Sequence, residues 1–232
     1  MTTDLSTSRT MASSLASSLR SDIIRGQLPP GSRLPIKDLC ERYDVSAIPM
    51  REALSRLATS GFVVAEDQRG FRVADVSPEE LADITETRIH VECEALRRSI
   101  LHGGLDWEEK LAGAHHRLSR LPMLAEGRAG VSEDWDRAHV AFHSALIGGC
   151  GSKWLLTLAE LLRDQTARYR HLSVAGQQPA PKGGKRSGPA RDVPAEHQQI
   201  VEAALARDAQ RACALLAEHF KTTTQLVLGK KG

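Results

Sequence analysis

The sequence has few aromatic residues, no long apolar run and no apolar leader, and each shortage excludes a class of protein. Only 4% of its 232 residues are aromatic, which argues against the platforms on which proteins stack single-stranded nucleic acids. Even the apolar stretch at 155–162 is interrupted by Thr157 and Glu160, so we expect no membrane span. Residues 1–10 are polar and lack a signal core, which predicts a cytoplasmic protein.

Cysteine is also scarce. The four cysteines, Cys40, Cys93, Cys150 and Cys213, lie more than 50 positions apart, and none forms a C-x-x-C pair. In a reducing compartment such residues behave as small buried hydrophobes. The sequence therefore predicts neither a disulfide nor a cysteine-ligated metal.

Neither sign of charge predominates. Lys and Arg number 31 against 29 Asp and Glu, for a formal net charge of +2, and 41% of the residues are hydrophobic. This composition is typical of an ordinary soluble globular protein and excludes disordered and collagen-like chains. Any interaction with nucleic acid must depend on where the charges lie, not on their sum.

The first third of the chain combines helical and strand patterns. Three segments repeat apolar residues at helical spacing: 11–25, 35–43 and 46–60. The second and third are separated by a short turn, with Ser46 as an N-cap, which predicts a helix-turn-helix. Two β-rich segments then follow, 62–65 and 71–74. Residues 1–76 are therefore predicted to form a winged helix-turn-helix domain.

From residue 77 to residue 232 every patterned segment is helical. The predicted helices are 78–100, 107–124, 132–148, 152–174, 194–207 and 208–227. Asp208 is expected to cap the last helix and to form the turn of an antiparallel hairpin. The stretch 176–188 is rich in Pro, Gly and Lys, which predicts a mobile loop. The fold class is mainly α, with a helical bundle after the winged domain.

Outside its apolar stripe, the third predicted helix carries polar side chains, among them Ser46, Arg51 and Arg56. Small hydroxyls suit phosphate contacts, and arginine can donate to O6 and N7 of one guanine. Gly70, at the predicted wing tip, permits a close approach to DNA because it has no side chain. A helix-turn-helix can also be a structural corner, but the wing that follows favours DNA binding.

Three runs have fixed spacings: Gly26-x-Leu28-x-Pro30-Gly31, Pro49-Met50-Arg51-Glu52-Ala53-Leu54 and Arg69-Gly70. They resemble the DNA-binding domain of the GntR family of bacterial transcription regulators. The resemblance implies that Lys37, Ser46, Arg51 and Gly70 contact DNA. Many relatives carry a second arginine directly after the hydroxyl residue, where this sequence has Ala47.

Four histidines are spaced so that helix packing can bring them together. His139 and His143 are four residues apart and project from one face of a helix. His197 lies 11 residues before Asp208 and His219 lies 11 after it, so the predicted hairpin places both at the same height. An all-imidazole site suits zinc, nickel or copper-like metals.

Two other interpretations of the histidines stay open. Nine histidines in a mostly helical chain easily produce a pair four apart, and we interpret His90, His115 and His116 as surface residues. The four clustered histidines also fit a metal-dependent hydrolase, in which the metal activates water. That function is the weaker alternative, because no Glu or Asp stands beside His139 or His143 as the base of an H-E-x-x-H helix.

Further runs lie in the second half of the chain: Ala138-His139-x-x-Phe142-His143, Cys150-Gly151-Ser152, Glu196-His197 and Glu218-His219. They resemble the helical effector domain (FCD) of the FadR branch of the GntR family. The resemblance implies a metal on His143, His197 and His219. Relatives have Asp or Asn where this sequence has His139, so His139 either ligates the metal or hydrogen-bonds an effector.

The same resemblance places arginines at an effector pocket. Arg88 and either Arg168 or Arg170 correspond to these positions, and arginine captures carboxylates bidentately. For Arg88 the alternative is a surface ion pair with Glu92. The long helices also carry more apolar surface than one bundle core needs, which predicts a homodimer.

Together these patterns predict a DNA-binding transcriptional repressor rather than an enzyme. Its winged domain is expected to bind double-stranded operator DNA. Its helical domain is expected to bind a small carboxylate beside a divalent ion, zinc or nickel, held by His139, His143, His197 and His219.

Overall fold

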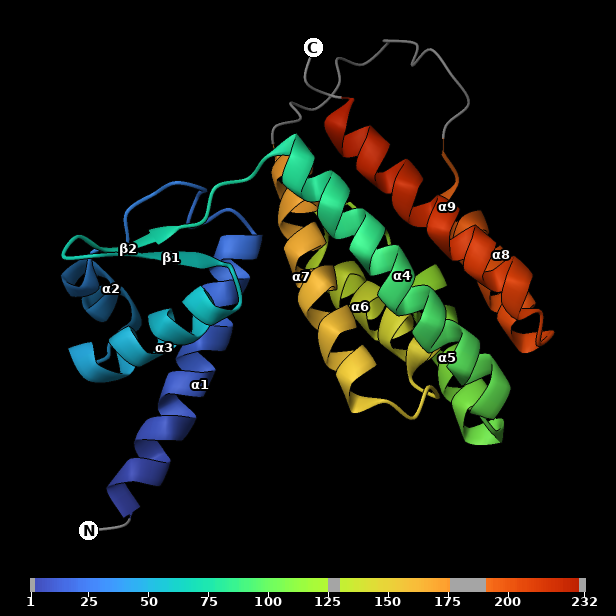
Figure 1. Cartoon of the computed structure of the whole chain (residues 1–232), viewed down its shortest axis with the longest axis horizontal. Helices are drawn as coiled ribbons and strands as arrows, with labels where there is room; N and C mark the ends of the chain where they lie inside the picture. Colours follow the sequence, from blue (N-terminus) through green and yellow to red (C-terminus); the bar gives the residue numbers. More distant parts are fainter. Residues whose placement is uncertain (1–2, 125–129, 176–190, 230–232) are drawn as a thin grey trace. The chain divides into compact units, whose positions relative to one another are not determined.

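The computed structural model describes residues 3–124, 130–175 and 191–229 (Figure 1). These residues divide into two compact units. The first contains the chain up to Ser77 together with residues 167–172, and the second contains residues 78–166 and the chain from Ser173 onward. The predicted mobile loop at 176–188 lies outside the described residues. In the described ranges, no helix has the length and apolarity that a membrane span requires.

The first unit contains three helices, α1 (Thr3–Ile24), α2 (Ile36–Tyr43) and α3 (Ala47–Thr59). Apolar side chains of α1 and α3 form its core: Leu15, Leu19, Ile23, Met50, Leu54 and Leu57. Asp44 ends α2 in a left-handed conformation with φ of 52°, so only a short turn separates α2 from α3. The predicted helix-turn-helix is confirmed, although α1 begins well before Met11.

Two strands follow α3 and form the wing. β1 (Val63–Glu66) and β2 (Gly70–Val73) pair antiparallel, from Val63 opposite Val73 to Glu66 opposite Gly70. β1 begins and ends one residue later than predicted, and β2 one residue earlier. The turn between them is tight, since the amide of Arg69 donates to the carbonyl of Glu66 at 3.0 Å.

Six helices follow the wing in the part of the chain described: α4 (Pro78–His102), α5 (Leu105–Ser119), α6 (Glu133–Ile147), α7 (Lys153–Ala175), α8 (Val193–Leu205) and α9 (Ala209–Leu228). They form the second unit, except that residues 167–172 of α7 belong to the first. The predicted caps are present, since Ser132 accepts from the amide of Trp135 and Asp208 accepts from that of Arg211. α5 ends earlier than predicted. Pro122 follows closely and disfavours a helical conformation in the residue before it.

The bundle core is formed by large apolar side chains from five of these helices: Leu96, Leu111, Phe142, Leu146, Ile200, Leu216 and Phe220. α9 lies beside α4 and beside α8, and α5 lies beside α6 (Figure 1). This arrangement confirms the mainly helical fold class. It also places α6, α8 and α9 around one interior region, where the four predicted histidines are found.

Candidate functional site

The exposed side of α3 forms the first candidate site. Met50 and Leu54 turn inward, so Arg51 and Ser46 remain exposed. Ser46 occupies the N-cap position of α3, but its side chain makes no capping hydrogen bond. The predicted N-cap is therefore correct in position only. A hydroxyl that does not cap the helix is available for contact with phosphate.

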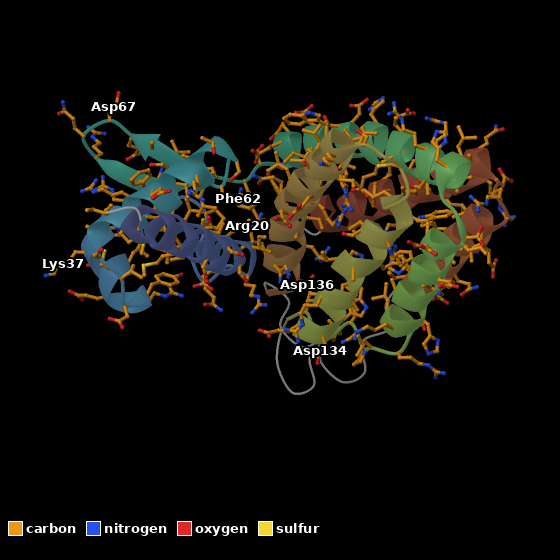
Figure 2. All side chains as sticks on the ribbon, turned by 90° about the horizontal axis from the view of Figure 1, so that it is seen from below. Arg20, Lys37, Phe62, Asp67, Asp134 and Asp136 are labelled. Carbon is orange, nitrogen blue, oxygen red and sulfur yellow. The ribbon has the colours of Figure 1, made fainter. Side chains whose placement is uncertain are left out.

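The wing and the starts of α2 and α3 enclose a hollow of about 620 Å³. Three cationic side chains line it: Arg33, Arg51 and Arg69. Figure 2 shows Asp67 at the tip of the wing and Lys37 on α2, pointing outward. Gly70 has φ of 90°, and nothing lies within 4 Å of the position a β-carbon would take, so the wing backbone can come close to a ligand.

Arg56, a predicted DNA contact, has another structural role. Its guanidinium donates to Ser13 of α1 at 2.6 Å and pairs with Glu52 at 2.6 Å. The bond to Ser13 joins α3 to α1, while the pair with Glu52 lies within α3. The DNA contact of Arg56 stays untested, but because its guanidinium is engaged in this way we expect it to contribute little to DNA binding. Helical spacing identified Arg56 as polar and could not show that α1 packs beside it.

Ile48 is a residue that sequence reasoning missed. It lies in the first turn of α3 and is 77% exposed. An apolar side chain on an exposed recognition helix can contact the methyl group of thymine. The sequence feature that could have identified Ile48 as a DNA-contact candidate is its position between Ala47 and Pro49, outside the apolar stripe of the predicted helix.

The second candidate site is the cluster of His139, His143, His197 and His219. One potential ligand atom from each ring lies within 4.8 Å of those of all the others. His139 and His143 share one face of α6, with ring centroids 4.5 Å apart. The α8–α9 hairpin supplies the other two, whose ring centroids are 4.8 Å apart. The equal-arm argument from Asp208 therefore describes the observed arrangement.

All four imidazoles are buried, and burial governs their titration. It lowers the pKa of His143 well below its ordinary value, with a further contribution from His139. Burial also lowers the pKa of His197 to about 3. The pKa of His219 falls for the same reason, although its hydrogen bond to Glu196 opposes the shift. These three rings are thus neutral at physiological pH, as a metal ligand must be.

Several ring nitrogens in the cluster are buried without a hydrogen-bond partner. Both nitrogens of His143 and Nε2 of His197 are in this state. A buried polar atom without a partner costs about 1–3 kcal/mol. The residues present therefore fit a divalent ion, which would bind one nitrogen of each ring and suits an imidazole donor set.

A second layer of polar contacts orients His219. Its Nδ1 lies 2.7 Å from Oε2 of Glu196, and that carboxylate pairs with Arg191 at 2.6 Å. Burial raises the pKa of Glu196, but hydrogen bonds from His219 and Arg191 outweigh it and bring the pKa to about 2. The carboxylate thus holds the Nδ1 proton, which leaves Nε2 of His219 free for a ligand. Sequence reasoning missed Arg191.

Arg88 is not on the surface. Its side chain is 8% exposed and pairs with the fully buried Glu92 at 2.6 Å. It also donates to Thr166 at 3.0 Å and lies 3.8 Å from the ring centroid of Phe220, the neighbour of His219. Its charge contributes to the lowered pKa values of His143 and His219. The surface ion pair is therefore excluded, and Arg88 lies near the cluster.

Arg168 and Arg170 fall in residues 167–172, which belong to the first compact unit. Arg168 is fully buried, donates to the carbonyl of Ala74 at 2.7 Å and lies 5.6 Å from the ring centroid of Phe62. These contacts are with Ala74 and Phe62 of the winged domain. Arg170 is half-buried in the same segment.

A hollow of about 310 Å³ opens beside the cluster. Trp135, which stacks on His139 at 4.6 Å, lines it together with Arg191 and His197. His115 lines it too and lies 5.8 Å from the ring centroid of Phe142. His115 is therefore half-buried, and its interpretation as a simple surface residue is wrong. The sequence pattern of α5 does not distinguish a half-buried histidine from an exposed one.

Two family models match the chain. Residues 11–73 match the bacterial regulatory proteins of the gntR family, and residues 83–222 match the FCD domain. The first model covers the helix-turn-helix and the wing. The second covers all four clustered histidines.

Curated relatives extend the similarity over most of the chain. The HTH-type transcriptional regulator BphR of Paraburkholderia xenovorans (strain LB400) is 40% identical over 90% of this chain and 82% of its own. The HTH-type transcriptional repressor GlaR of Escherichia coli (strain K12) is 35% identical over 90% of this chain and 92% of its own.

Among solved structures, E. coli McbR/YncC aligns with a TM-score of 0.77 at 21% identity, covering 96% of this chain and 99% of that one. A transcriptional regulator GntR from Rhodococcus sp. RHA1 aligns with a TM-score of 0.69 at 23% identity, covering 96% and 100%. At these identities the likeness supports the fold.

Proposed function

The chain belongs to the GntR family of bacterial transcriptional regulators and carries an FCD domain, and on that premise we propose that it represses transcription from an operator until a small carboxylate binds its metal-containing helical domain. Membership of the family makes it a DNA-binding regulator and not the hydrolase that the histidines alone also suggested. The name of one relative, a transcriptional repressor, supports repression as the direction of control.

The winged domain is proposed to bind an inverted repeat as part of a homodimer. Arg51 would read a base edge in the major groove, while Lys37, Ser46 and the backbone of Gly70 would contact phosphates or the minor groove. Dimerisation is supported by large apolar side chains that stay exposed on the helical unit: Leu101, Leu105 and Trp154. Such side chains are typical of protein interfaces.

The helical domain is proposed to hold a divalent ion, zinc or nickel, on His143, His197 and His219, with His139 as the fourth ligand. The observation that carries this proposal is the set of buried ring nitrogens without partners, with all four ligand atoms within 4.8 Å of one another. When bound, the ion would supply an electrophilic coordination position for an anion. The ligands are neutral, so they leave its charge uncompensated except through Glu196.

The effector is proposed to be a small carboxylate or hydroxycarboxylate. Four imidazoles leave the site more positive than the Asp-containing set of relatives would, and the guanidinium of Arg88, whose charge Glu92 balances, lies near it. A carboxylate can meet both charges at once, with one end at the ion and the other near the guanidinium. The 310 Å³ hollow beside Trp135 and His197 offers room for an acid next to the cluster, and the cation that lines this hollow is Arg191.

The test combines metal analysis with DNA binding. We expect the purified protein to contain about one zinc or nickel per chain, and EDTA to lower its melting temperature, because a ligand of the native state stabilises it. Fluorescence anisotropy with DNA from upstream of the protein's own gene should show specific binding that weakens when a panel of dicarboxylates and hydroxy acids is titrated in. Absence of metal together with a melting temperature indifferent to EDTA and zinc would rule out the metal-controlled mechanism, while specific DNA binding would survive that result.

A further inference from the structure

The proposed function does not use two cysteines that the fold brings together. Cys93 lies on α4 and Cys213 on α9, and both are partly exposed. The thiol of Cys93 donates to the carbonyl of Cys213 at 3.5 Å, and the thiol of Cys213 donates to the carbonyl of Cys93 at 3.3 Å. This reciprocal bonding places each sulfur against the other residue's backbone, across two helices that pack along their length.

The other two cysteines differ from this pair. Cys150 is buried, and its thiol donates to the carbonyl of Ser152 at 3.7 Å. Cys40 lies on α2, in the other compact unit. Neither has a second thiol beside it in the part of the chain that the structure describes. Proximity of two thiols is therefore a particular property of Cys93 and Cys213.

The surroundings of the pair also favour reaction at one sulfur. When Cys213 is ionised, the Cys93 thiol can donate to its sulfur instead of to its carbonyl, and this hydrogen bond, followed by burial, raises the pKa of Cys93. The same bond lowers the pKa of Cys213 to about 7, and the nearby cation of Arg97 lowers it further. The thiolate is the nucleophilic form of cysteine. Cys213 is thus the attacking thiol, and Cys93 is placed to resolve the product.

We propose that Cys93 and Cys213 form a reversible intramolecular disulfide when the protein meets a peroxide. The Cys213 thiolate attacks one oxygen of hydrogen peroxide, breaks the O–O bond and becomes a sulfenic acid, while hydroxide leaves. The Cys93 sulfur then attacks the sulfenic sulfur, the S–S bond forms and water leaves. That water carries the Cys93 proton, and the hydroxide of the first step takes up the proton that Cys213 released on ionising, so two thiols and one peroxide give one disulfide and two waters.

The bond would join two helices that also hold the predicted effector region. On the same pair of helices, Thr85 and Thr224 hydrogen-bond at 2.7 Å, and Arg88 lies against Phe220. Joining α4 to α9 covalently would limit any movement of these side chains relative to each other. Spacing in the sequence predicted no disulfide, because the 120 positions between the two residues hide a contact that only helix packing creates.

The test treats the full-length, metal-loaded protein with hydrogen peroxide, blocks free thiols, digests with trypsin and analyses the peptides without reduction. We expect residues 89–97 linked to residues 212–221, with the loss of two hydrogen atoms, and separation of the two peptides by dithiothreitol. The matched control Cys40→Ser should give the same linked pair, and Cys213→Ser should give none.

Mixed isotopically heavy and light chains distinguish the two possible linkages. Linked peptides of uniform isotope composition support the proposal, and heavy–light pairs would overturn it by showing a bond between chains. Recovery of both peptides unlinked, under conditions that oxidise the methionines, would overturn it as well. Each of these outcomes is measured on the wild-type protein, so the test does not depend on whether a variant folds.

Discussion

Two arginines on one helix show how neighbouring side chains of the same type acquire different roles. Arg51 is exposed in the hollow between α3 and the wing, while Arg56 is held by Ser13 and Glu52. The difference follows from the direction in which each side chain leaves α3. One points toward the open face, and the other points toward α1.

We therefore expect Arg51→Ala to weaken operator binding by about 1–3 kcal/mol, or roughly 5- to 150-fold in Kd. Arg56→Ala is the matched control and should leave Kd nearly unchanged. It should lower the free energy of unfolding by no more than about 1 kcal/mol, since its ion pair is partly exposed. Anisotropy and urea titration measure the two effects. Equal affinities for Arg51→Ala and wild type, with unchanged circular dichroism, would refute the assignment of α3 as the recognition helix.

Glu196 allows a test of the metal site at a residue that is not a ligand, because its carboxylate holds the proton on Nδ1 of His219. Glu196→Gln removes the charge and keeps the shape, so we expect zinc affinity to fall about 10- to 100-fold. Glu218→Gln, an exposed carboxylate next to His219, is the control and should retain wild-type affinity. Competition with a fluorescent zinc chelator gives both constants. An unchanged affinity for Glu196→Gln would exclude its proposed positioning role.

Helix α6 and the α8–α9 hairpin enclose imidazoles that stay neutral at pH values at which the unfolded chain would protonate them. The folded pKa of His197 is about 3, and those of His143 and His219 are also lowered, whereas the unfolded value is about 6.5. Below the unfolded value the unfolded chain binds more protons than the native bundle. The metal-free bundle must therefore lose stability as pH falls through this range.

For the metal-free protein we expect the free energy of unfolding to fall between pH 7 and pH 5 by up to about 1.4 kcal/mol per pH unit for each buried histidine. Glu196 does not contribute in this window, because its folded pKa is about 2 and the unfolded value is about 4.3. Urea unfolding of wild type and His197→Gln measures the slope, which should be smaller in the variant. Identical slopes would show that His197 titrates alike in both states.

At the scale of the whole molecule, the proposed repression requires that two binding events be coupled. If a carboxylate weakens DNA binding by a given factor, DNA must weaken carboxylate binding by the same factor. Arg88 is the side chain through which this coupling can be tested. Removing it alone would leave Glu92 buried without its partner, which is strongly destabilising.

The double variant Arg88→Met with Glu92→Leu removes both charges together. We expect it to bind zinc and operator DNA like wild type but to need at least tenfold more carboxylate for release, because the anion loses one of its two cationic partners. Isothermal titration of the acid and anisotropy of the operator complex provide the two readouts. A wild-type response to the acid would place anion recognition elsewhere in the bundle.

The order of helices, the winged domain and the grouping of the four histidines could be predicted without a structure. These follow from local rules: apolar spacing, capping residues such as Ser132 and Asp208, and the four-residue spacing of His139 and His143. The hairpin argument also worked because both arms are regular helices of fixed rise.

Which side chains meet across helices is visible only in the packed molecule. Packing brings Arg56 against Ser13 of α1, Arg168 against Ala74 and Phe62, and Cys93 beside Cys213. It also places Glu196 and Arg191 beside His219. None of these contacts has a periodic signature. Each depends on the rotation and approach of packed helices, which the whole set of buried side chains fixes together.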